Sequence, residues 1–306
     1  MGHRKCTEAL EFIQKLRGGS QPILVKASDG FLYVVKFLDN LQGPNVPFNE
    51  ALGTQLFRQA GLPAPEWSLV QISEDFLNRN PECWLETEHG WRRPKEGLCF
   101  GSRFLNSKNG SLFEILPQSY FSRIRNRRDF TKAWVLDVLC GHSDNRQAIF
   151  VQGQTKWLEA HFIDHGHLFG GADGLASPVF WASQYLDPDI YGIAGVEDAW
   201  DIENSLHEID LTALADTIDT LPSAWKTAEA LCRFELFRQR MSDPLRLRNT
   251  IHLILGLWDR AGESYDRDLS QSAAGPRRTN LYTKISKADV FARNGGRGCY
   301  FVGGER

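Results

Sequence analysis

Several patterns that assign a function class at once are missing from this sequence. The six cysteines form no Cys-x-x-Cys pair and show no zinc-ribbon spacing, so neither a zinc ribbon nor a dithiol redox centre is expected. An even cysteine count in a chain of 306 residues is no disulfide framework, and we expect reduced thiols and a cytoplasmic location. No His-Glu-x-x-His sequence is present, which excludes the zinc-binding helix motif of the metalloproteases.

Strong charge and long apolar runs are missing as well. The formal net charge is only -3 at pH 7, which gives no reason to expect nucleic acid or a membrane as the main partner. No run of about 18 apolar residues occurs, so no transmembrane helix is expected. The first residues, MGHRKCTEALEFIQKL, lack the apolar core of a signal peptide. One basic run, RIRNRRDF at 123–130, fits a solvated loop or the start of a helix.

What is present is the composition of a globular protein, 42% hydrophobic and 24% charged, with enough chain to bury a large core. The first hundred residues alternate β-rich runs with one helix. Asp29-Gly30 predicts a hairpin turn between two of these runs. The helix is predicted to start with Asn49 as its cap and to end at Gly61. A short amphipathic element is predicted at 7–17, and further strands at 66–73 and 97–105.

The rest of the chain is mainly helical. Helices are predicted at 130–142, 212–221, 224–241 and 244–260. Two short β-like runs, QAIFVQ and AHFID, follow the first of them. From about residue 261 the chain is polar and rich in glycine, serine and arginine, which is typical of a loosely ordered segment. We therefore predict an α+β protein with a β-rich part over 1–105, a helical part over 106–260 and a polar tail over 261–306.

A lysine and a glutamate follow one another on adjacent elements of the β-rich part. Lys36 lies in the apolar run YVVKFL, and a lysine among apolar neighbours needs a partner because burying its charge alone is costly. Glu50, early in the helix that follows, is the candidate partner, although a carboxylate near a helix N-terminus is also favourable by itself. Upstream, Gly18 and Gly19 precede Ser20, which fits either a plain turn or a backbone that approaches phosphates closely.

Two aspartates stand at the edges of apolar segments in the helical part. Asp144 follows the helix at 130–142 and precedes a β-like run, where a carboxylate can orient a substrate hydroxyl. Asp164 follows the second β-like run, where a hard oxygen ligand suits Mg²⁺. Each aspartate taken alone also fits an ordinary turn or cap.

The histidines near these aspartates leave a second chemistry open. Imidazole nitrogens and a carboxylate together are typical ligands of a transition metal, as in a metal-dependent hydrolase. Packed or solvent-facing histidines are the alternative interpretation. The candidate ligands are His142, His161, Asp164, His165 and His167.

Taken together, these residues resemble the HipA-like kinases, in particular the compact branch of that family without the N-terminal extension. The resemblance covers roughly residues 15–260. It rests on GGSQP, VVKFL, NEALGTQLFRQAGLPAPE, FGSRFL, DVLCGHSDNRQAIFV and FIDHGHLFGG, of which GLPAP and the Asp-x-Arg-Gln … Ile-Asp-His-Gly pair are the most specific.

The resemblance implies a bilobal protein-kinase-like fold with ATP and Mg²⁺ as cofactors. Lys36 would contact phosphate oxygens and pair with Glu50. Asp144 would be the catalytic-loop aspartate, while Asp164 would hold Mg²⁺, and Lys36 and Arg146 would stabilise charge on the transferring phosphate. The residues implied to bind nucleotide are Gly19, Ser20 and Gln21 over the phosphates and Phe100, Gly101, Ser102 and Arg103 as the hinge that contacts adenine through backbone groups.

One position departs from the kinase pattern. Kinases place a metal-binding asparagine about five residues after the catalytic aspartate, but residue 149 is isoleucine, and Gln147 is the nearest amide. Beside the metal-dependent hydrolase we therefore carry two hypotheses: a kinase that phosphorylates a protein Ser/Thr hydroxyl, with a lipid or small-molecule hydroxyl as the alternative acceptor, and a pseudokinase that binds nucleotide or a partner. The expected partner is a protein substrate, with no nucleic acid and no membrane; the sequence sets no oligomeric state.

Overall fold

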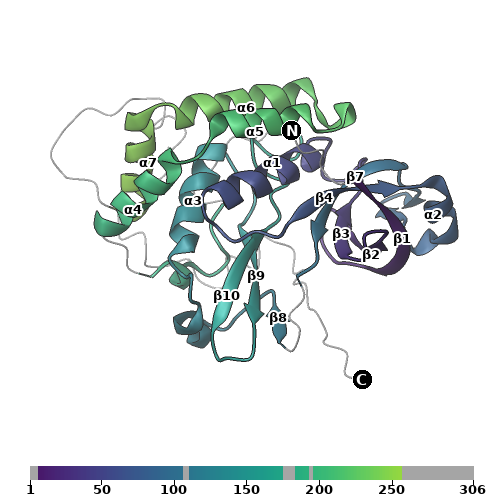
Figure 1. The fold of residues 1–306 in the computed structure, drawn as a ribbon, viewed down its shortest axis with the longest axis horizontal. Helices are drawn as coiled ribbons and strands as arrows, with labels where there is room; N and C mark the ends of the chain where they lie inside the picture. Colours follow the sequence, from purple (N-terminus) through teal and green to yellow (C-terminus); the bar gives the residue numbers. More distant parts are fainter. Residues whose placement is uncertain (1–5, 106–109, 175–182, 193–195, 257–306) are drawn as a thin grey trace. The chain divides into compact units, whose positions relative to one another are not determined.

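The structure is a computed structural model that describes residues 6–105, 110–174, 183–192 and 196–256 (Figure 1). Its N-terminal part is a closed five-stranded barrel in the order β1-β2-β3-β7-β4. β1 pairs antiparallel with β2 and parallel with β4, which closes the ring. The strands are β1 (Cys6–Lys15), β2 (Ile23–Ala27), β3 (Leu32–Lys36), β4 (Trp67–Ile72) and β7 (Gly97–Arg103).

Alternating apolar side chains explain why these segments form a barrel. The inward positions carry small and β-branched residues that fill the closed ring, and the neighbouring α2 (Glu74–Arg79) adds two more buried side chains. The fully buried members include Ile23, Val25, Val35, Val70 and Phe76. This barrel core is separate from the larger core of the helical part.

The element predicted at 7–17 is strand β1, whose first residues alternate between exposed and buried. The predicted hairpin at Asp29-Gly30 is confirmed, since β2 and β3 pair antiparallel on either side of it. Gly30 has φ +85°, a value that glycine adopts without the clash that a Cβ brings. The strands predicted at 66–73 and 97–105 are confirmed as β4 and β7.

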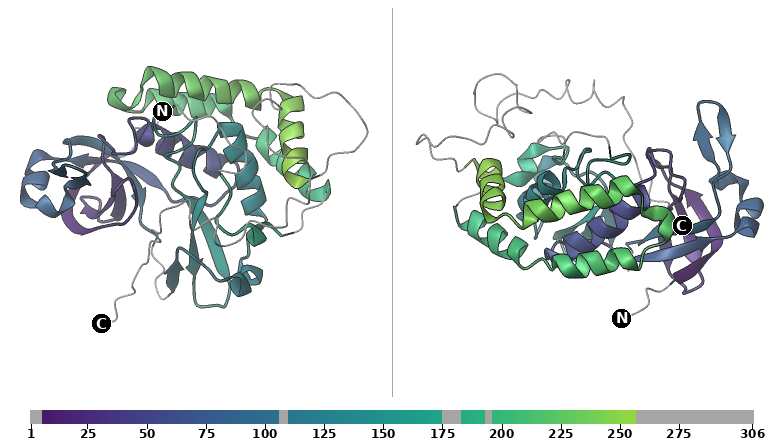
Figure 2. Two further views of the ribbon diagram at one scale, coloured as in Figure 1. Left: turned by 180° about the vertical axis from the view of Figure 1, so that it is seen from behind. Right: turned by 90° about the horizontal axis from the view of Figure 1, so that it is seen from above.

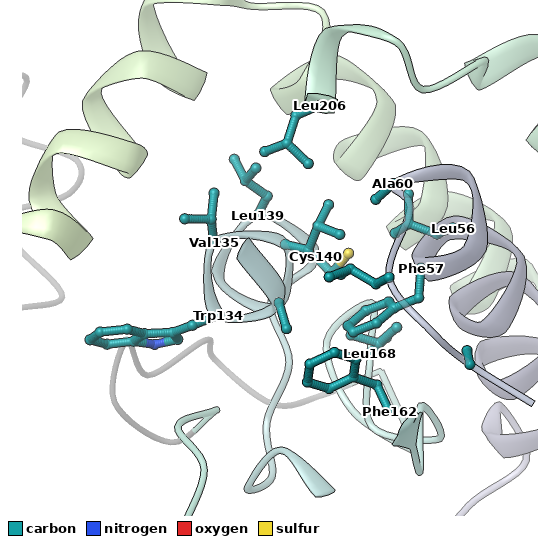
Figure 3. Close-up of a cluster of buried hydrophobic side chains, with 14 of the residues drawn as sticks. Leu56, Phe57, Ala60, Trp134, Val135, Leu139, Cys140, Phe162, Leu168 and Leu206 are labelled. Carbon is teal, nitrogen blue, oxygen red and sulfur yellow. The ribbon is translucent and has the colours of Figure 1, made fainter. Parts of the chain in front are cut away.

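Helix α1 (Val46–Gln59) joins the barrel to the rest of the described chain. Its side chains belong to the core of the helical part rather than to that of the barrel. Figure 3 shows Leu56 and Phe57 of α1 beside α3 (Asp129–Cys140), with Phe162 below them. The Phe57 and Phe162 rings lie 5.8 Å apart between centroids. Packing of α1 against the helical part therefore fixes where that helix points its polar residues.

The helical part contains a three-stranded sheet of order β10-β9-β8, which extends away from the helices (Figure 1). Each predicted helix in this part is found to start within a few residues of its predicted position, and the predicted end of the last one, at 260, lies outside the described residues. The sheet consists of β8 (Ser111–Phe113), β9 (Gln147–Gln152) and β10 (Leu158–Ile163). The helices that follow α3 are α4 (Val196–His207), α5 (Leu211–Asp219), α6 (Ala228–Met241) and α7 (Pro244–Leu255). Short 3-10 turns lie at Pro81–Cys83, Gln118–Arg123, Pro188–Tyr191 and Ser223–Trp225.

Local capping explains where several helices begin. Asp243 caps α7 by accepting from the backbone N–H groups of Leu245 and Arg246, as the Asp243-Pro244 pair predicts. The predicted start of α1 is wrong, because the helix begins at Val46 after Asn45 and Asn49 lies inside it. Pro47 in the first turn favours the earlier start. The polar tail predicted at 261–306 lies outside the described residues.

A small hairpin is inserted between β4 and β7. It consists of β5 (Leu85–Thr87) and β6 (Gly90–Arg92) and projects from the barrel (Figure 2). The side chain of Leu85 is fully buried in the barrel core and anchors the base of the hairpin. In the described part of the chain, no helix is long and apolar enough to cross a membrane.

Candidate active site

Three charged side chains from distant parts of the chain meet in one cluster. Lys36 is the last residue of β3, Glu50 lies in α1, and Asp164 follows β10. The Lys36 ammonium donates to Glu50 Oε1 and, at 2.7 Å, to Asp164 Oδ1. Only 9% of the Lys36 side chain and 3% of the Glu50 side chain are exposed, against 23% for Asp164. The carboxylate of Asp164 is therefore the part of the cluster that solvent reaches.

Glu50 also holds the backbone that follows Asp164. Its two carboxylate oxygens accept the N–H groups of His165 and Gly166, each at 3.1 Å. A Cβ at Gly166 would lie only 3.2 Å from Glu50 Oε1 and 3.2 Å from Val46, so glycine permits this close approach. Glu50 thus ties α1 to the Asp164 segment through two hydrogen bonds and to the end of β3 through a third, from Lys36.

The charges in this cluster stabilise one another. Burial by itself lowers the pKa of Lys36, but the carboxylates of Asp164 and Glu50 outweigh it and raise that pKa above its usual value. Burial likewise favours the neutral form of Asp164, yet the Lys36 ammonium holds the pKa of this carboxyl well below its usual range. For Glu50, burial is the larger influence and raises the pKa. Lys36 and Asp164 are therefore both charged at neutral pH.

The Asp164 side chain is aimed by an unusual backbone conformation. Its φ is +60°, in the left-handed region that aspartate tolerates better than most residues. Gln147, at the start of β9, donates from Nε2 to Asp164 Oδ2 at 2.8 Å. The structure thus brings together the two residues expected to bind the metal. A carboxylate and an amide, each with a hard oxygen donor, fit Mg²⁺.

Asp144 lies in the loop between α3 and β9, and the loop is held on two sides. Ser143 donates its N–H to the carbonyl of His167, and Asn145 donates from Nδ2 to the carbonyl of Gln184, each at 3.1 Å. Asp144 Oδ1 accepts the N–H of Asn145 at 2.8 Å, and the side chain stays half-exposed. A partly exposed carboxylate on a restrained loop is placed to accept or orient a proton.

Arg146 does not have the role expected for it. Its guanidinium is fully buried and forms a two-bond pair with Asp137 of α3, from Nε at 2.9 Å and from NH2 at 2.5 Å. Its NH1 donates to the carbonyl of Ile163 at 2.8 Å, and the guanidinium carbon lies 4.7 Å from the centre of the Phe57 ring. The expectation that Arg146 contacts a transferring phosphate is wrong, since all three nitrogens of the guanidinium bind protein groups out of reach of solvent.

The histidines do not form a metal centre. His142 and His165 are buried beside Arg146, with their Nδ1 atoms 3.3 Å and 3.2 Å from its guanidinium nitrogens. His167 Nδ1 lies 3.4 Å from Ser143 Oγ, while His161 is paired with Glu159 at 3.9 Å. Across the ranges that the structure describes, no three His, Cys, Asp or Glu side chains are grouped to hold a metal ion.

The glycine turn between β1 and β2 is well defined. The Gln21 N–H bonds the carbonyl of Gly18 at 3.0 Å, and Gly18 has φ +131°. A Cβ at Gly19 would lie 3.0 Å from the side chain of Gln42, so the turn packs closely on the loop after β3. Ser20 is buried, and the amide of Gln21 turns to the β5–β6 hairpin. Of the three residues expected over phosphates, Ser20 and Gln21 therefore direct their side chains to other parts of the protein.

The implied hinge does not fit the barrel. Strand β7 lies between β3 and β4, so that Phe100 pairs with Lys36 on one side and Leu69 on the other. Gly101 and Ser102 pair in the same way on both sides, and Arg103 pairs with Tyr33 and donates its N–H to the carbonyl of Glu66. Because the ladder occupies the backbone of Phe100–Arg103, those groups are not available for the adenine contacts implied for them.

The sequence did not reveal the part that two residues take in the site. Asn49 donates from Nδ2 to the carbonyls of Gly166, Leu168 and Gly171 at 2.8 to 3.1 Å, and so holds the glycine-rich segment after Asp164. Asp137 is the buried partner of Arg146. A signal for Asp137 is present in the sequence, since it is a lone carboxylate in the apolar run AWVLDVLC.

Comparisons with known proteins place this architecture. The structure is similar to a Helicobacter pylori proinflammatory kinase, CtkA, with a TM-score of 0.52 and 13% sequence identity, over 82% of this chain and 98% of that one. A Golgi casein kinase with Mn/ADP bound aligns at a TM-score of 0.49 and 13% identity, over 86% of this chain and 75% of that one. No protein-family profile and no curated protein sequence matches. The chain therefore has a kinase-like α+β fold, with a closed five-stranded barrel in its N-terminal part.

Proposed function

We propose that this protein is an ATP- and Mg²⁺-dependent kinase of the HipA-like type that transfers the γ-phosphate to the hydroxyl group of a protein Ser or Thr. The observation that carries the proposal is the cluster of Lys36, Glu50 and Asp164. A strand lysine paired with a helix glutamate beside a metal-type aspartate is the arrangement that protein kinases use for phosphoryl transfer. The kinase-like fold supports the same conclusion.

Each residue then has a distinct task. The Lys36 ammonium, oriented by Glu50, contacts phosphate oxygens and stabilises the charge that develops on them. Asp164 and Gln147 would hold Mg²⁺, which neutralises charge on the nucleotide phosphates when it is bound. Asp144 orients the acceptor hydroxyl and accepts its proton. Because Phe100–Arg103 are occupied by strand pairing, the adenine contacts fall to other residues around the site.

The substrate and setting belong to the same proposal. A protein Ser/Thr substrate, a bilobal arrangement around the nucleotide and a cytoplasmic location with reduced thiols are expected from the family resemblance and the cysteine pattern. The described cysteines are all free, in keeping with that expectation; they are Cys6, Cys83, Cys99, Cys140 and Cys232.

One observation favours a second candidate, a nucleotide-binding protein without transfer. Both carboxylate oxygens of Asp164 have a protein donor, Lys36 on Oδ1 and Gln147 on Oδ2. A cation that binds Asp164 must replace at least one of these donors, and Gln147 replaces the asparagine that kinases use. Turnover with metal separates the two candidates.

The experiment is an assay of ATP turnover by the purified protein with and without Mg²⁺. We expect Mg²⁺-dependent turnover that falls about 10²-fold or more in Asp144→Asn and in Asp164→Asn. Asp219→Asn changes an exposed aspartate of α5 and is the control that keeps full activity. Nucleotide binding without turnover on added protein or small-molecule acceptors would instead support the binding protein.

A further inference from the structure

The glycine turn and the β5–β6 hairpin are joined by a reciprocal pair of hydrogen bonds. Gln21 donates from Nε2 to the carbonyl of Glu86 at 2.8 Å, and the Glu86 N–H donates to Gln21 Oε1, also at 2.8 Å. All three residues of β5 lie opposite residues of β6, with Glu86 opposite Trp91, and both backbone groups of Glu86 bond the Gln21 amide of the turn. The side-chain amide of Gln21 thus makes the two hydrogen bonds to Glu86 that a residue of a neighbouring strand would make.

Other contacts hold the hairpin against the same end of the barrel. Lys15, at the end of β1, donates from Nζ to the carbonyl of Trp84 at 2.5 Å and lies 4.8 Å from the centre of the Trp91 ring. Arg92 of β6 donates from NH2 to the carbonyl of Asp39 at 2.7 Å, and its NH1 lies 3.5 Å from the Asp39 carboxylate. The hairpin therefore contacts both the end of β1 and the loop that follows β3.

The turn needs such support. Gly18 and Gly19 lose more conformational freedom on ordering than any other residue type, and Gln21 has φ +44°, which is unfavourable for a residue with a side chain. A turn of this kind is mobile unless its surroundings hold it, and a mobile turn must lose that freedom when it binds a phosphate. Two additional hydrogen bonds from the hairpin remove part of that cost before the nucleotide arrives.

We propose that the β5–β6 hairpin is a clamp that orders the glycine turn in advance, and that Gln21 is a positioning residue for the phosphates of the nucleotide. Gln21 acts through its amide pair with the Glu86 backbone and does not itself touch phosphate. This inference rests on the proposed nucleotide site. It assigns the hairpin, which carries none of the expected site residues, a part in nucleotide affinity.

Two variants break the clamp from opposite sides. Gln21→Met keeps the length of the side chain and adds no charge, but it removes both hydrogen-bonding groups. Glu86→Pro removes the N–H that donates to Gln21 and leaves the turn itself untouched, and proline is compatible with the extended backbone there. Glu86→Ala is the matched control, because the pair uses only the backbone of Glu86.

Two measurements are made on these proteins. In the turnover assay, we expect Gln21→Met and Glu86→Pro each to raise KM for ATP about tenfold with kcat within about twofold, and Glu86→Ala to behave as wild type. Without nucleotide, hydrogen exchange at the Leu16 and Gln21 amides, which bond across the turn, is expected to accelerate in the same two variants only.

The outcomes separate the alternatives. A raised KM in Gln21→Met with a normal KM in Glu86→Pro would mean that Gln21 contacts the nucleotide directly, and the clamp would be rejected. Unchanged exchange in both variants would also overturn it. If wild type neither binds nor turns over ATP, the proposed function fails, whereas the exchange data still decide whether the hairpin orders the turn.

Discussion

Two buried charge clusters contact the segment Ile163–His165, and they differ in how far their side chains are exposed to solvent. In the first, Lys36 binds Glu50 and Asp164, and 23% of the Asp164 side chain is exposed. In the second, Arg146 binds Asp137, with exposed side-chain fractions of 1% and 0%. Both hold the same segment, the first through the Asp164 carboxylate and the second through the carbonyl of Ile163.

The difference in exposure separates an ion pair that can bind a ligand from one that only stabilises the fold. In a cluster that solvent reaches, the lysine can exchange a carboxylate for a phosphate, and the aspartate can exchange the ammonium for a cation. The cost is small because the incoming ligand replaces the lost contact. A cluster with no exposed atoms offers no such exchange, and each of its charges depends on the other. We therefore expect the Lys36 cluster to determine activity and the Arg146 cluster to determine stability, which three experiments can break or sharpen.

The largest expected effect is on stability and comes from Arg146→Met. Removing the guanidinium leaves the buried Asp137 carboxylate with only the His142 ring beside it, at 3.4 Å, and also removes the donor to Ile163. We expect the free energy of unfolding, measured by urea denaturation, to fall by about 3–5 kcal/mol. Arg248→Met removes the pair between an exposed arginine and Glu203 and is the control; we expect a much smaller change. Equal midpoints for the two variants would show that the buried pair contributes nothing to stability.

Lys36→Met has the opposite balance, a large loss of activity with a smaller loss of stability. We expect ATP turnover to fall about 100-fold, since the phosphates lose their cationic partner. The free energy of unfolding is expected to fall by only about 1–2 kcal/mol, because burial already raises the pKa of Glu50 and this carboxyl accepts a proton once the ammonium is gone.

The control for Lys36→Met is Lys26→Met on the neighbouring strand β2, where the side chain is exposed. It is expected to retain full turnover. Full turnover by Lys36→Met as well would remove Lys36 from the site. Unfolding of Lys36→Met at room temperature would show that the first cluster also determines stability, which would contradict the contrast between the two clusters.

The sequence, with the family resemblance, was sufficient to anticipate that Lys36 pairs with Glu50, whereas the bond from Lys36 to Asp164 was not anticipated. A lysine within an apolar strand must find a partner, and the helix that follows offers Glu50 one turn inside its start. The aspartates stand where apolar runs end, so their side chains lie at edges of the sheet. Turn, proline and capping residues also located most strands and helices, because these signals act within a few positions of the chain.

Long-range pairing is what the sequence did not reveal. The role of Arg146 depends on Asp137, a residue of another element, and on the burial that α1 imposes through Phe57. The occupied backbone of Phe100–Arg103 follows from the closure of the barrel, which no local pattern encodes. Asn49 resembled a helix cap because asparagine is common there, yet its amide binds carbonyls more than 115 positions away.

The smallest expected effect is a pH dependence that belongs to the second cluster alone. Burial lowers the pKa of His142 below its usual 6.5, although the Asp137 carboxylate opposes the shift. The unfolded chain therefore binds this proton first as the pH falls, so the stability that the neutral ring contributes is complete above about pH 6.5 and declines below it. The slope contributed by one ring is at most about 1.4 kcal/mol per pH unit.

The test compares urea denaturation of wild type and His142→Asn between about pH 7.5 and 5. Asparagine keeps a polar atom near the position of Nδ1, which lies 3.3 Å from the Arg146 guanidinium, but it does not titrate. We expect the variant to lose less stability than wild type over this range, while His89→Asn, at an exposed site in the β5–β6 hairpin, follows wild type. Asp137, whose pKa is held below its usual 3.8, titrates at more acidic pH and is common to all three proteins, so it leaves the comparison unchanged. If the free energy of unfolding of wild type and of His142→Asn changes equally with pH, burial in the second cluster does not keep His142 neutral. The difference in exposure would then not distinguish the two clusters.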